Sequence, residues 1–384
     1  MPSDSVAAFR AAEYGEHPVL HLDSASYGLF PRRTVAALHD LAERRNRGGS
    51  IGDVDLDRCL DRARRAAASL VAVDPSEISL VPNTTYGIHL GVGLVAAGPP
   101  GVIVVSEGEF PANVLPWMAL ESRGFEVRIV PLRDGLPDEE ALRRAALESG
   151  VRALAVSAVQ FNSGYRVELG ALGEACRRGG TLFVVDAIQA LGTLRLDAEA
   201  LGIDVLATGA QKWLLSPWGS GFAWVPARHR DRIVPPVVSW LAVEGGSAFS
   251  AAAGYALDYL GDGRRFEPAT LGTQDYLGMA LSIEGLLEVG LDSVRDHLRE
   301  LHAVVLEWAA GRDEVRVIGV PDPERRGGIL SLAMPDPEGV RLALEARDIA
   351  VAVRDGLLRI SPHVHVTEEE MVRTVEALDA AVLR

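Results

Sequence analysis

Short apolar runs rich in β-formers alternate with amphipathic helical patterns through most of the chain, and this alternation limits the fold most strongly. Strands are expected at Ile78–Val81, Val102–Val105, Val127–Val130, Ala153–Ser157, Leu182–Val185, Val205–Thr208 and Phe222–Val225. Helical patterns such as Glu139–Glu148 and Leu169–Arg178 lie between several of them. This alternation predicts a mostly parallel sheet covered on both faces. Ligands of such sheets bind beyond the carboxyl ends of the strands.

After about residue 270 the pattern changes. A long helical stretch from Tyr276 to Ala310 precedes shorter elements, which are expected at Arg316–Val320, Gly328–Ala333, Glu338–Arg347, Val351–Arg354, Leu357–Ser361 and Glu368–Leu383. This mixture predicts a smaller α+β domain. We therefore divide the chain into an N-terminal arm (residues 1–20), a large domain (21–270) and a small C-terminal domain (271–384). No low-complexity linker separates them, so they are expected to pack together.

Lys212 is the single lysine among 38 basic residues, and all the others are arginines. A GC-rich genome that writes arginine at most surface positions would leave such a lysine by chance. The alternative is that this position needs an amine, because lysine can lose its proton and form a Schiff base, which arginine cannot. Lys212 follows the apolar run Val205–Thr208, with small residues before it and glycines after it. That context favours an amine that reaches a ligand at a strand end.

Asp186 ends the preceding apolar run Leu182–Val185 and is followed by Gln189 in an Asp-x-x-Gln pattern. An aspartate at a strand end is most often a turn or cap residue. It can also keep a pyridine nitrogen protonated, as the electron sink of pyridoxal 5'-phosphate (PLP) requires. In combination with Lys212, Asp186 and Gln189 favour this second interpretation.

The chain resembles the fold type I, class V PLP enzymes, which include cysteine desulfurases, kynureninase and isopenicillin N epimerase. The resemblance runs from His21–Ser26 to Leu358–His363. Its most specific parts are the Asp-x-x-Gln and Lys-Trp-Leu segments. It implies an α/β fold, with a mostly parallel seven-stranded sheet in a large PLP-binding domain and a smaller α+β C-terminal domain. It also implies that Lys212 and Asp186 are catalytic and that both contact the cofactor, together with Gln189.

Further cofactor contacts follow from the resemblance. Thr84 and Thr85 come after a strand and open a helix, where N–H groups and hydroxyls hold phosphate, although a plain helix cap is the alternative. Phe110 stands where the family places a ring that stacks on the cofactor, often a histidine in desulfurases; a core phenylalanine is the alternative. An amide bonds the phenolic oxygen of the cofactor, and both Gln160 and Asn162 are candidates, with Gln160 favoured.

Two more phosphate contacts are implied. Gln211 stands where desulfurases commonly have histidine. The segment Arg265–Glu267, followed by Gly272 and Thr273, resembles an Arg-Phe-Glu…Gly-Thr segment that reaches the phosphate of the neighbouring subunit in dimers of this class. Extra residues after Glu267 leave the register of Thr273 open. We therefore expect a homodimer in which the Thr273 region contributes to the neighbouring site.

Arg354 and Arg359 flank the last expected pair of strands. A guanidinium group suits bidentate binding of an amino-acid carboxylate. Arg359 matches the carboxylate-binding arginine of the superfamily, and Arg354 and Ser26 are taken as further substrate-binding residues. The nearby His363 and His365 have no third ligand close in sequence, so no metal site is expected.

The net charge of −15 and the lack of any run of basic residues argue against a nucleic-acid partner, but not against anionic small ligands. The uncharged stretch Ile88–Ser106 contains several glycines and prolines, so a helix end, a turn and a strand fit better than a membrane span. The chain starts without a signal-peptide pattern, and Cys59 and Cys176 cannot form a disulfide framework. These features predict a cytoplasmic protein without a membrane partner.

The cysteines also bear on the reaction. Desulfurases accept sulfur on a loop cysteine shortly before the final conserved strand, but no cysteine follows Cys176. The tail Leu358–Val364 resembles sulfur-compound lyases such as the ergothioneine-pathway enzyme. The favoured function is therefore a β-eliminating carbon–sulfur lyase acting on an amino-acid-type substrate. The alternatives are a class V aminotransferase or a PLP-dependent deaminase, epimerase or decarboxylase, and, from another class, a non-catalytic PLP-binding protein.

Overall fold

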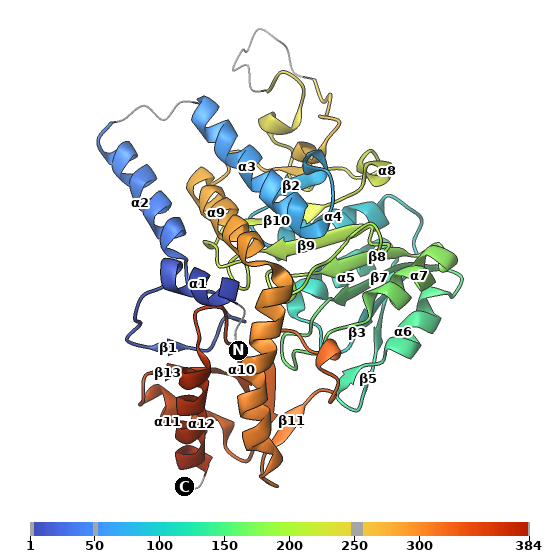
Figure 1. The fold of residues 1–384 in the computed structure, drawn as a ribbon. Coiled ribbons are helices and arrows are strands. Elements are labelled where there is room, and N and C mark those ends of the chain that lie inside the picture. The colour runs from blue at the N-terminus through green and yellow to red at the C-terminus, as the bar shows by residue number, and fades with distance from the viewer. Residues whose placement is uncertain (1–3, 49–52, 247–255, 383–384) are drawn as a thin grey trace.

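The computed structural model describes residues 4–48, 53–246 and 256–382 (Figure 1). Met1–Ser3 of the expected N-terminal arm and Leu383, the expected end of the last helix, lie outside the described residues. The stretch Ile88–Ser106 forms a helix end, a turn and a strand, as expected. No helix in the described part of the chain is both long and apolar enough to cross a membrane.

A seven-stranded sheet forms the centre of the large domain, and all seven expected strands are present in it. Its order across the sheet is β2-β10-β9-β8-β7-β3-β4. The bounds are β2 (Ile78–Leu80), β3 (Val102–Ser106), β4 (Glu126–Val130), β7 (Val151–Ser157), β8 (Leu182–Asp186), β9 (Val205–Gly209) and β10 (Gly221–Trp224). Only β10 runs antiparallel to its neighbours. The mostly parallel sheet is thus confirmed, and β8, which ends at Asp186, is adjacent to β9, which precedes Lys212.

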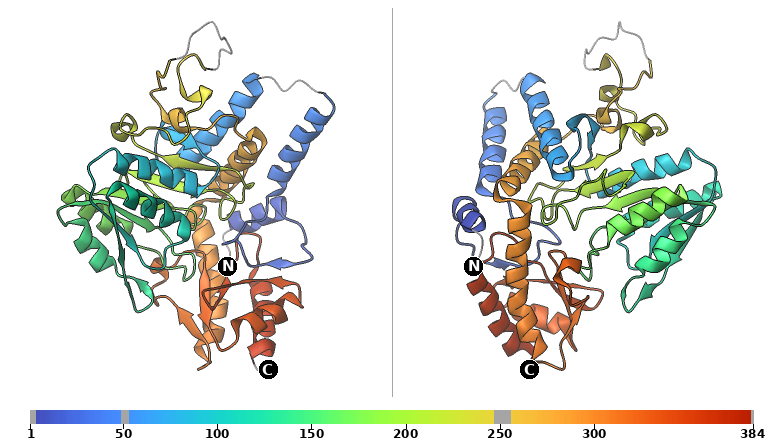
Figure 2. Two further views of the ribbon diagram at one scale, coloured as in Figure 1. Left: turned by 180° about the vertical axis from the view of Figure 1, so that it is seen from behind. Right: turned by 45° about the vertical axis from the view of Figure 1, so that its right-hand side comes forward.

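Helices cover both faces of this sheet (Figure 2). The helices α4 (Thr84–Ala96) and α5 (Leu115–Met118) belong to one face, and α6 (Glu139–Ala146) and α7 (Leu169–Gly179) belong to the other. Alternate residues of β7 separate into the two cores, because successive side chains of a strand point to opposite faces. The sheet is therefore buried on both sides, and its ligand-binding edge is the row of strand ends.

The C-terminal part begins with two helices, α9 (Thr273–Val289) and α10 (Leu291–Ala310), and the single helical stretch expected there is wrong. The break falls at Gly290, whose φ of 88° suits glycine. An antiparallel four-stranded sheet follows, in the order β11-β12-β15-β14. The remaining bounds are β11 (Arg316–Ile318), β12 (Leu330–Ala333), α11 (Pro337–Glu345), β13 (Ile349–Ala350), β14 (Ala352–Arg354), β15 (Leu357–Ile360) and α12 (Glu368–Val382).

The N-terminal segment joins the two parts of the chain. The short strand β1 (Leu20–His21) pairs in parallel with β13, so this segment lies beside the C-terminal part (Figure 1). The helix α9 packs against α2 (Arg32–Asn46) and α3 (Asp53–Val71). The other elements are α1 (Asp4–Glu13), β5 (Leu132–Arg133), β6 (Leu136–Pro137) and α8 (Ala227–Arg230). The parts of the chain therefore pack together, as expected, and the domain bounds drawn at residues 21 and 271 stay a prediction.

Candidate active site

Lys212 lies in a tight turn just beyond β9. The Leu215 N–H donates to the Lys212 carbonyl at 3.0 Å, and Leu215 adopts a φ of 55°, which is costly for a residue other than glycine. The surroundings hold this conformation, because the Ser282 hydroxyl of α9 donates to the Leu215 carbonyl at 2.8 Å. The Gly28 N–H also donates to the Gln211 carbonyl at 2.8 Å. The turn that presents Lys212 is therefore fixed by α9 and by the N-terminal segment.

Lys212 and Asp186 both have pKa values shifted toward their neutral forms. Burial lowers the pKa of the Lys212 amine, the charge of Asp186 opposes this shift, and the charge of Arg359 adds to it. Burial raises the pKa of the Asp186 carboxyl, and the negative charge of Glu109 raises it further. An amine with a lowered pKa is neutral at a lower pH than a surface lysine, as a nucleophile or a base must be.

Trp213, directly after Lys212, is held from several directions, and the sequence analysis assigned it no role. Its indole N–H donates to Gln189 Oε1 at 2.7 Å, and Gln189 Nε2 donates to the Ala25 carbonyl at 3.1 Å. His363 Nε2 lies 3.0 Å from the Trp213 carbonyl. Gln189 and His363 therefore position Trp213. A direct contact between Gln189 and a cofactor stays a prediction.

The buried carboxylate of Glu109 organises the neighbouring strand ends. It accepts hydrogen bonds from the Ser157 N–H at 2.8 Å, from Gln160 Nε2 at 2.8 Å and from Asn113 Nδ2 at 2.9 Å. The sequence analysis chose only Phe110 from this segment and missed Glu109. The signal that was available is a carboxylate shortly after an apolar strand, the same signal that identified Asp186.

Phe110 is 45% exposed, so the alternative of a core phenylalanine is wrong. Its ring centroid lies 5.7 Å from Lys212 Nζ, and the Phe161 ring packs against it edge-on at 5.3 Å. An exposed aromatic face next to a reactive amine is available to stack on a planar ring. Phe110 is therefore close to Lys212, and its stacking on a cofactor ring stays a prediction.

The two amide candidates occupy different surroundings. Gln160 is buried and bonded to Glu109, whereas Asn162 donates from Nδ2 to the exposed Asp355 at 3.0 Å. Gln160 therefore shares the environment of Asp186, since the charge of Glu109 acts on both groups. This arrangement agrees with the preference for Gln160, whose contact with a cofactor remains a prediction.

The N-terminus of α4 lies at the end of β9. Thr84 Oγ1 accepts a hydrogen bond from the Gly209 N–H at 2.8 Å, whereas Thr85 is exposed. Gln211 packs against the same glycine, where an added Cβ would come within 2.5 Å of its Oε1. Helix N-termini bind phosphate through free N–H groups and the helix dipole. The structure thus brings Thr84, Thr85 and Gln211 to one end of the site.

Arg359 anchors the opposite end. Its Nη2 donates to Asp23 Oδ1 at 2.9 Å and to Ser26 Oγ at 2.7 Å, and its Nη1 donates to the Phe161 carbonyl at 3.0 Å. Arg354 Nη2 also donates to Ser26 Oγ, at 3.3 Å. Arg359 Nε is buried without a hydrogen-bond partner among the described residues. The three expected substrate-binding residues are therefore together, and Asp23 is the partner that the sequence analysis missed.

Thr273 is the site residue that was expected to act in a neighbouring subunit. It opens α9, and its hydroxyl donates to the Leu271 carbonyl at 3.5 Å. Its role in a neighbouring subunit stays a prediction. His365 Nε2 lies 2.9 Å from the His21 carbonyl. Within residues 4–48, 53–246 and 256–382, no group of three or more His, Cys, Asp or Glu side chains is arranged to hold a metal ion.

Comparison with known proteins decides the family. The family model described as Aminotransferase class-V matches residues 20–374. The chain belongs to this class V family. It is therefore a PLP-dependent enzyme, and the expected fold type I architecture is confirmed by solved structures of this fold. The residues present fit PLP, because an amine of lowered pKa, a buried carboxylate, an exposed ring face and a helix N-terminus converge here.

The relatives of this class V enzyme catalyse different reactions. Isopenicillin N epimerase of Streptomyces clavuligerus is 30% identical, over 83% of this chain and 83% of the relative. A probable cysteine desulfurase of Methanothermobacter thermautotrophicus is 26% identical, over 94% of each chain. C-DES, described as a cystine C–S lyase in complex with cysteine persulfide, has a TM-score of 0.84 at 20% identity, covering 94% of this chain and 97% of C-DES. In another C-DES structure glycine is covalently linked to the PLP cofactor.

Proposed function

We propose that this class V enzyme is a PLP-dependent carbon–sulfur lyase that eliminates a sulfur substituent from the β-carbon of an amino acid. One observation carries the proposal: the chain resembles a desulfurase, but neither of its two cysteines is suited to take up sulfur. Cys176 is buried on α7, where burial raises the pKa of its thiol to about 12. Cys59 lies on α3, and burial raises its pKa too. The likeness to the fold of C-DES, a cystine C–S lyase, supports the proposal.

Each part of PLP has matching residues in this site. We assign Lys212 to its aldehyde group and Asp186 to its ring nitrogen. The residues that would stack on the ring or bind its oxygen atoms are Phe110, Gln160, Thr84, Thr85 and Gln211. When bound, PLP supplies an electron-accepting ring that stabilises negative charge on the α-carbon of the substrate.

Lys212 does the proton chemistry. The α-proton of the substrate passes to Lys212 Nζ, which acts as a base because burial and Arg359 lower the pKa of its amine. The backbone turn around Lys212 and the packed Trp213 limit where this amine can reach. Asp186 holds a proton at the ring nitrogen, in a setting where water does not compete for its carboxylate, because the side chain is buried.

Arg359 binds the carboxylate of the substrate. Arg359 is paired with the Asp23 carboxylate. Both Arg359 and Arg354 donate to the Ser26 hydroxyl, so two guanidinium groups lie near the single carboxylate of Asp23. The excess positive charge and the unpartnered Nε of Arg359 favour a bound carboxylate.

The proposed elimination rests on the lack of a cysteine suited to take up sulfur. With no cysteine placed to attack the sulfur, the carbon–sulfur bond breaks with its electron pair on sulfur, which leaves as a thiol after protonation. The three-carbon remainder takes up water and gives pyruvate and ammonia. The overall reaction consumes one water per substrate and needs no oxidant or second amino acceptor.

A second candidate is an epimerase or aminotransferase, which the likeness to isopenicillin N epimerase favours. The same Lys212 amine serves this chemistry, because removing the α-proton and returning it to the other face inverts the carbon. The two candidates differ in whether a β-substituent leaves.

The holoenzyme incubated with S-substituted cysteines tests the choice. We expect equal amounts of thiol, pyruvate and ammonia without any added keto acid. A requirement for a keto acid would make the enzyme an aminotransferase, and inversion without thiol release would make it an epimerase. As a control, Cys59→Ser and Cys176→Ala should keep kcat within about two-fold, because neither thiol takes part.

We also propose that the enzyme is a cytoplasmic homodimer with Thr273 near the neighbouring site. The resemblance of Arg265–Glu267 and Gly272–Thr273 to a segment of class V dimers supports this. Sedimentation should give twice the chain mass. Mixing Lys212→Ala subunits with Thr273→Ala subunits should restore one intact site per hybrid dimer, and a fully active monomer would contradict the proposal.

A further inference from the structure

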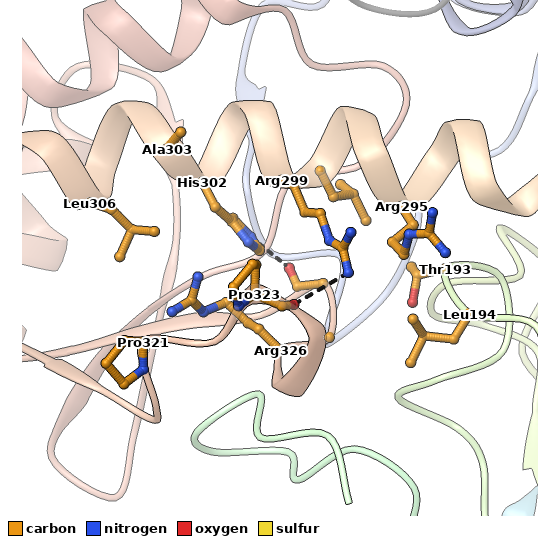
Figure 3. A pocket seen from close by; sticks show the side chains of 13 residues that line it. Thr193, Leu194, Arg295, Arg299, His302, Ala303, Leu306, Pro321, Pro323 and Arg326 are labelled. Carbon is orange, nitrogen blue, oxygen red and sulfur yellow. Dashed lines mark hydrogen bonds between the residues drawn. The ribbon is translucent and has the colours of Figure 1, made fainter. Parts of the chain in front are cut away.

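A cavity of about 250 Å³ lies between α10, the loop that follows Gln189, and the segment that leads into β12. Figure 3 shows α10 along one side, with Pro321, Pro323 and Arg326 facing it. Most of the lining is apolar, from Leu194, Leu298, Ala303, Leu306, Pro321 and Pro323. The volume is below the roughly 300–1,000 Å³ of pockets for drug-sized ligands, so a small molecule fits it.

Two of the arginines that line the cavity already have acidic partners. Arg295 pairs with Asp292 and Asp296, each at 2.9 Å. Arg299 pairs with Glu324 at 2.8 Å. Their charges are therefore largely balanced by neighbouring carboxylates at the rim.

Arg326 is different. Its Nη2 donates to the Val320 carbonyl at 3.2 Å, and no carboxylate pairs with it in the part of the chain that the structure describes. Burial lowers the pKa of its guanidinium group. His302 adds no positive charge, because burial lowers its pKa to about 3, and its Nε2 lies 3.1 Å from the Gly328 carbonyl. The cavity thus combines an apolar lining with one half-buried guanidinium group that has no carboxylate partner among the described residues and is available to an anion.

We propose that this cavity binds a small organic carboxylate, with the carboxylate on Arg326 and an apolar body between Leu298, Ala303 and Leu306. A guanidinium group matches the two oxygens of a carboxylate. The apolar walls favour a hydrocarbon or aromatic body over a polar one. The proposal does not depend on the reaction that the enzyme catalyses.

One wall of the cavity is formed by Gly328, which packs against Trp213. An added Cβ at Gly328 would lie 2.4 Å from the Trp213 ring, so backbone and indole are in direct contact there. Trp213 is the residue after Lys212, and none of the residues that line the cavity is a candidate active-site residue. A carboxylate bound here is distinct from a substrate bound at Arg359.

Calorimetry on the holoenzyme with phenylacetate, and with phenylacetamide as its neutral match, tests the proposal. Phenylacetate should bind at least about ten-fold more tightly than the amide, because only the carboxylate forms the charged pair. Arg326→Gln should weaken phenylacetate binding by about the same factor. Arg316→Gln, at an exposed position on β11, is the matched control and should leave binding unchanged.

Two further variants locate the bound molecule. Ala303→Phe fills the space with an aromatic ring and should weaken binding without changing any charge, while Arg359→Gln should keep it. Circular dichroism and thermal unfolding identify any variant that fails to fold. Equal binding of acid and amide, or undiminished binding by a folded Arg326→Gln variant, would overturn the proposal. Binding lost only in Arg359→Gln would place the carboxylate at the substrate site and would also overturn it.

Discussion

The proposed cofactor side and the proposed substrate side of the site are built in different ways. On the proposed cofactor side, Asp186 ends β8 and Lys212 follows β9, and these two strands are adjacent in one sheet. On the substrate side, Arg359 comes from β15 in the C-terminal sheet, and its partner Asp23 lies 336 positions earlier in the chain. The first side is formed by adjacent strand ends, although α9 and the N-terminal segment also hold the turn at Lys212. The second exists only after the two ends of the chain have packed together.

Their electrostatics differ as well. Neither Lys212 nor Asp186 forms an ion pair within 4.0 Å among the described residues, and burial pushes both pKa values toward the neutral forms. Arg359 is instead paired with Asp23 at 2.9 Å. A lysine amine with a lowered pKa can exchange protons, whereas a paired guanidinium group keeps its charge and geometry. The difference predicts that the cofactor side controls turnover and the substrate side controls binding.

The largest effect should come from Lys212→Ala, because it removes both the cofactor link and the base. We expect kcat to fall by about 10³-fold or more. Borohydride treatment of the unmodified holoenzyme, followed by peptide mapping, should find the cofactor on Lys212. A cofactor fixed elsewhere, or a variant that keeps a tenth of its activity, would break the assignment of the cofactor side.

Asp186→Asn should have the next largest effect. The amide keeps the shape of the side chain but not its negative charge, so α-proton removal should slow by about ten-fold or more while PLP still binds. Solvent exchange of the substrate α-proton and the cofactor absorbance measure the two properties separately. The exposed Asp57→Asn on α3 serves as the control and should leave both unchanged. Loss of PLP without slower exchange would give Asp186 a binding role only.

Arg359→Gln should raise KM by about 10-fold to 100-fold, with a smaller change in kcat, because a charged hydrogen-bonded contact to the substrate is lost. Arg354→Gln should raise KM less, since Arg354 is exposed and touches the site only through Ser26. Steady-state kinetics with one substrate checks both. If Arg359→Gln lowered kcat by 10-fold to 100-fold and left KM unchanged, the proposed difference between the two sides would be wrong.

The pKa of the Lys212 amine depends on charges from both sides of the site. Changing those charges should give the smallest effect of the four predictions. In the apoenzyme, acetylation of this amine needs its neutral form, so half-maximal labelling should lie below the ordinary lysine pKa of about 10.4. Arg354→Gln removes a like charge and should move the midpoint up, whereas Asp186→Asn removes an opposite charge and should move it down. Mass spectrometry of the Lys212 peptide across pH gives the midpoints. Shifts of the reverse sign would show that the pKa has another cause.

Much of the large domain was predictable from the sequence. Each strand is a short apolar run, and the helices show apolar residues at helical spacing. The split between α9 and α10 was missed because a glycine inside a helical pattern does not show which φ it adopts; at Gly290 that angle is 88°. Glu109 and Asp23 were missed for another reason. Their roles lie in partners far along the chain, Gln160 for the first and Arg359 for the second.

The sequence by itself determined the reactive groups: a single lysine beyond a strand, an aspartate at the end of the preceding strand, and the absence of a cysteine after Cys176. These are local facts of residue type and order. The tertiary structure alone decided that Trp213 is held by Gln189 and His363 and that Asp23 and Ser26 meet Arg359. It also decided that Arg326 has no acidic partner among the residues that the structure describes. Burial and charge balance depend on which distant segments meet, and only packing sets that.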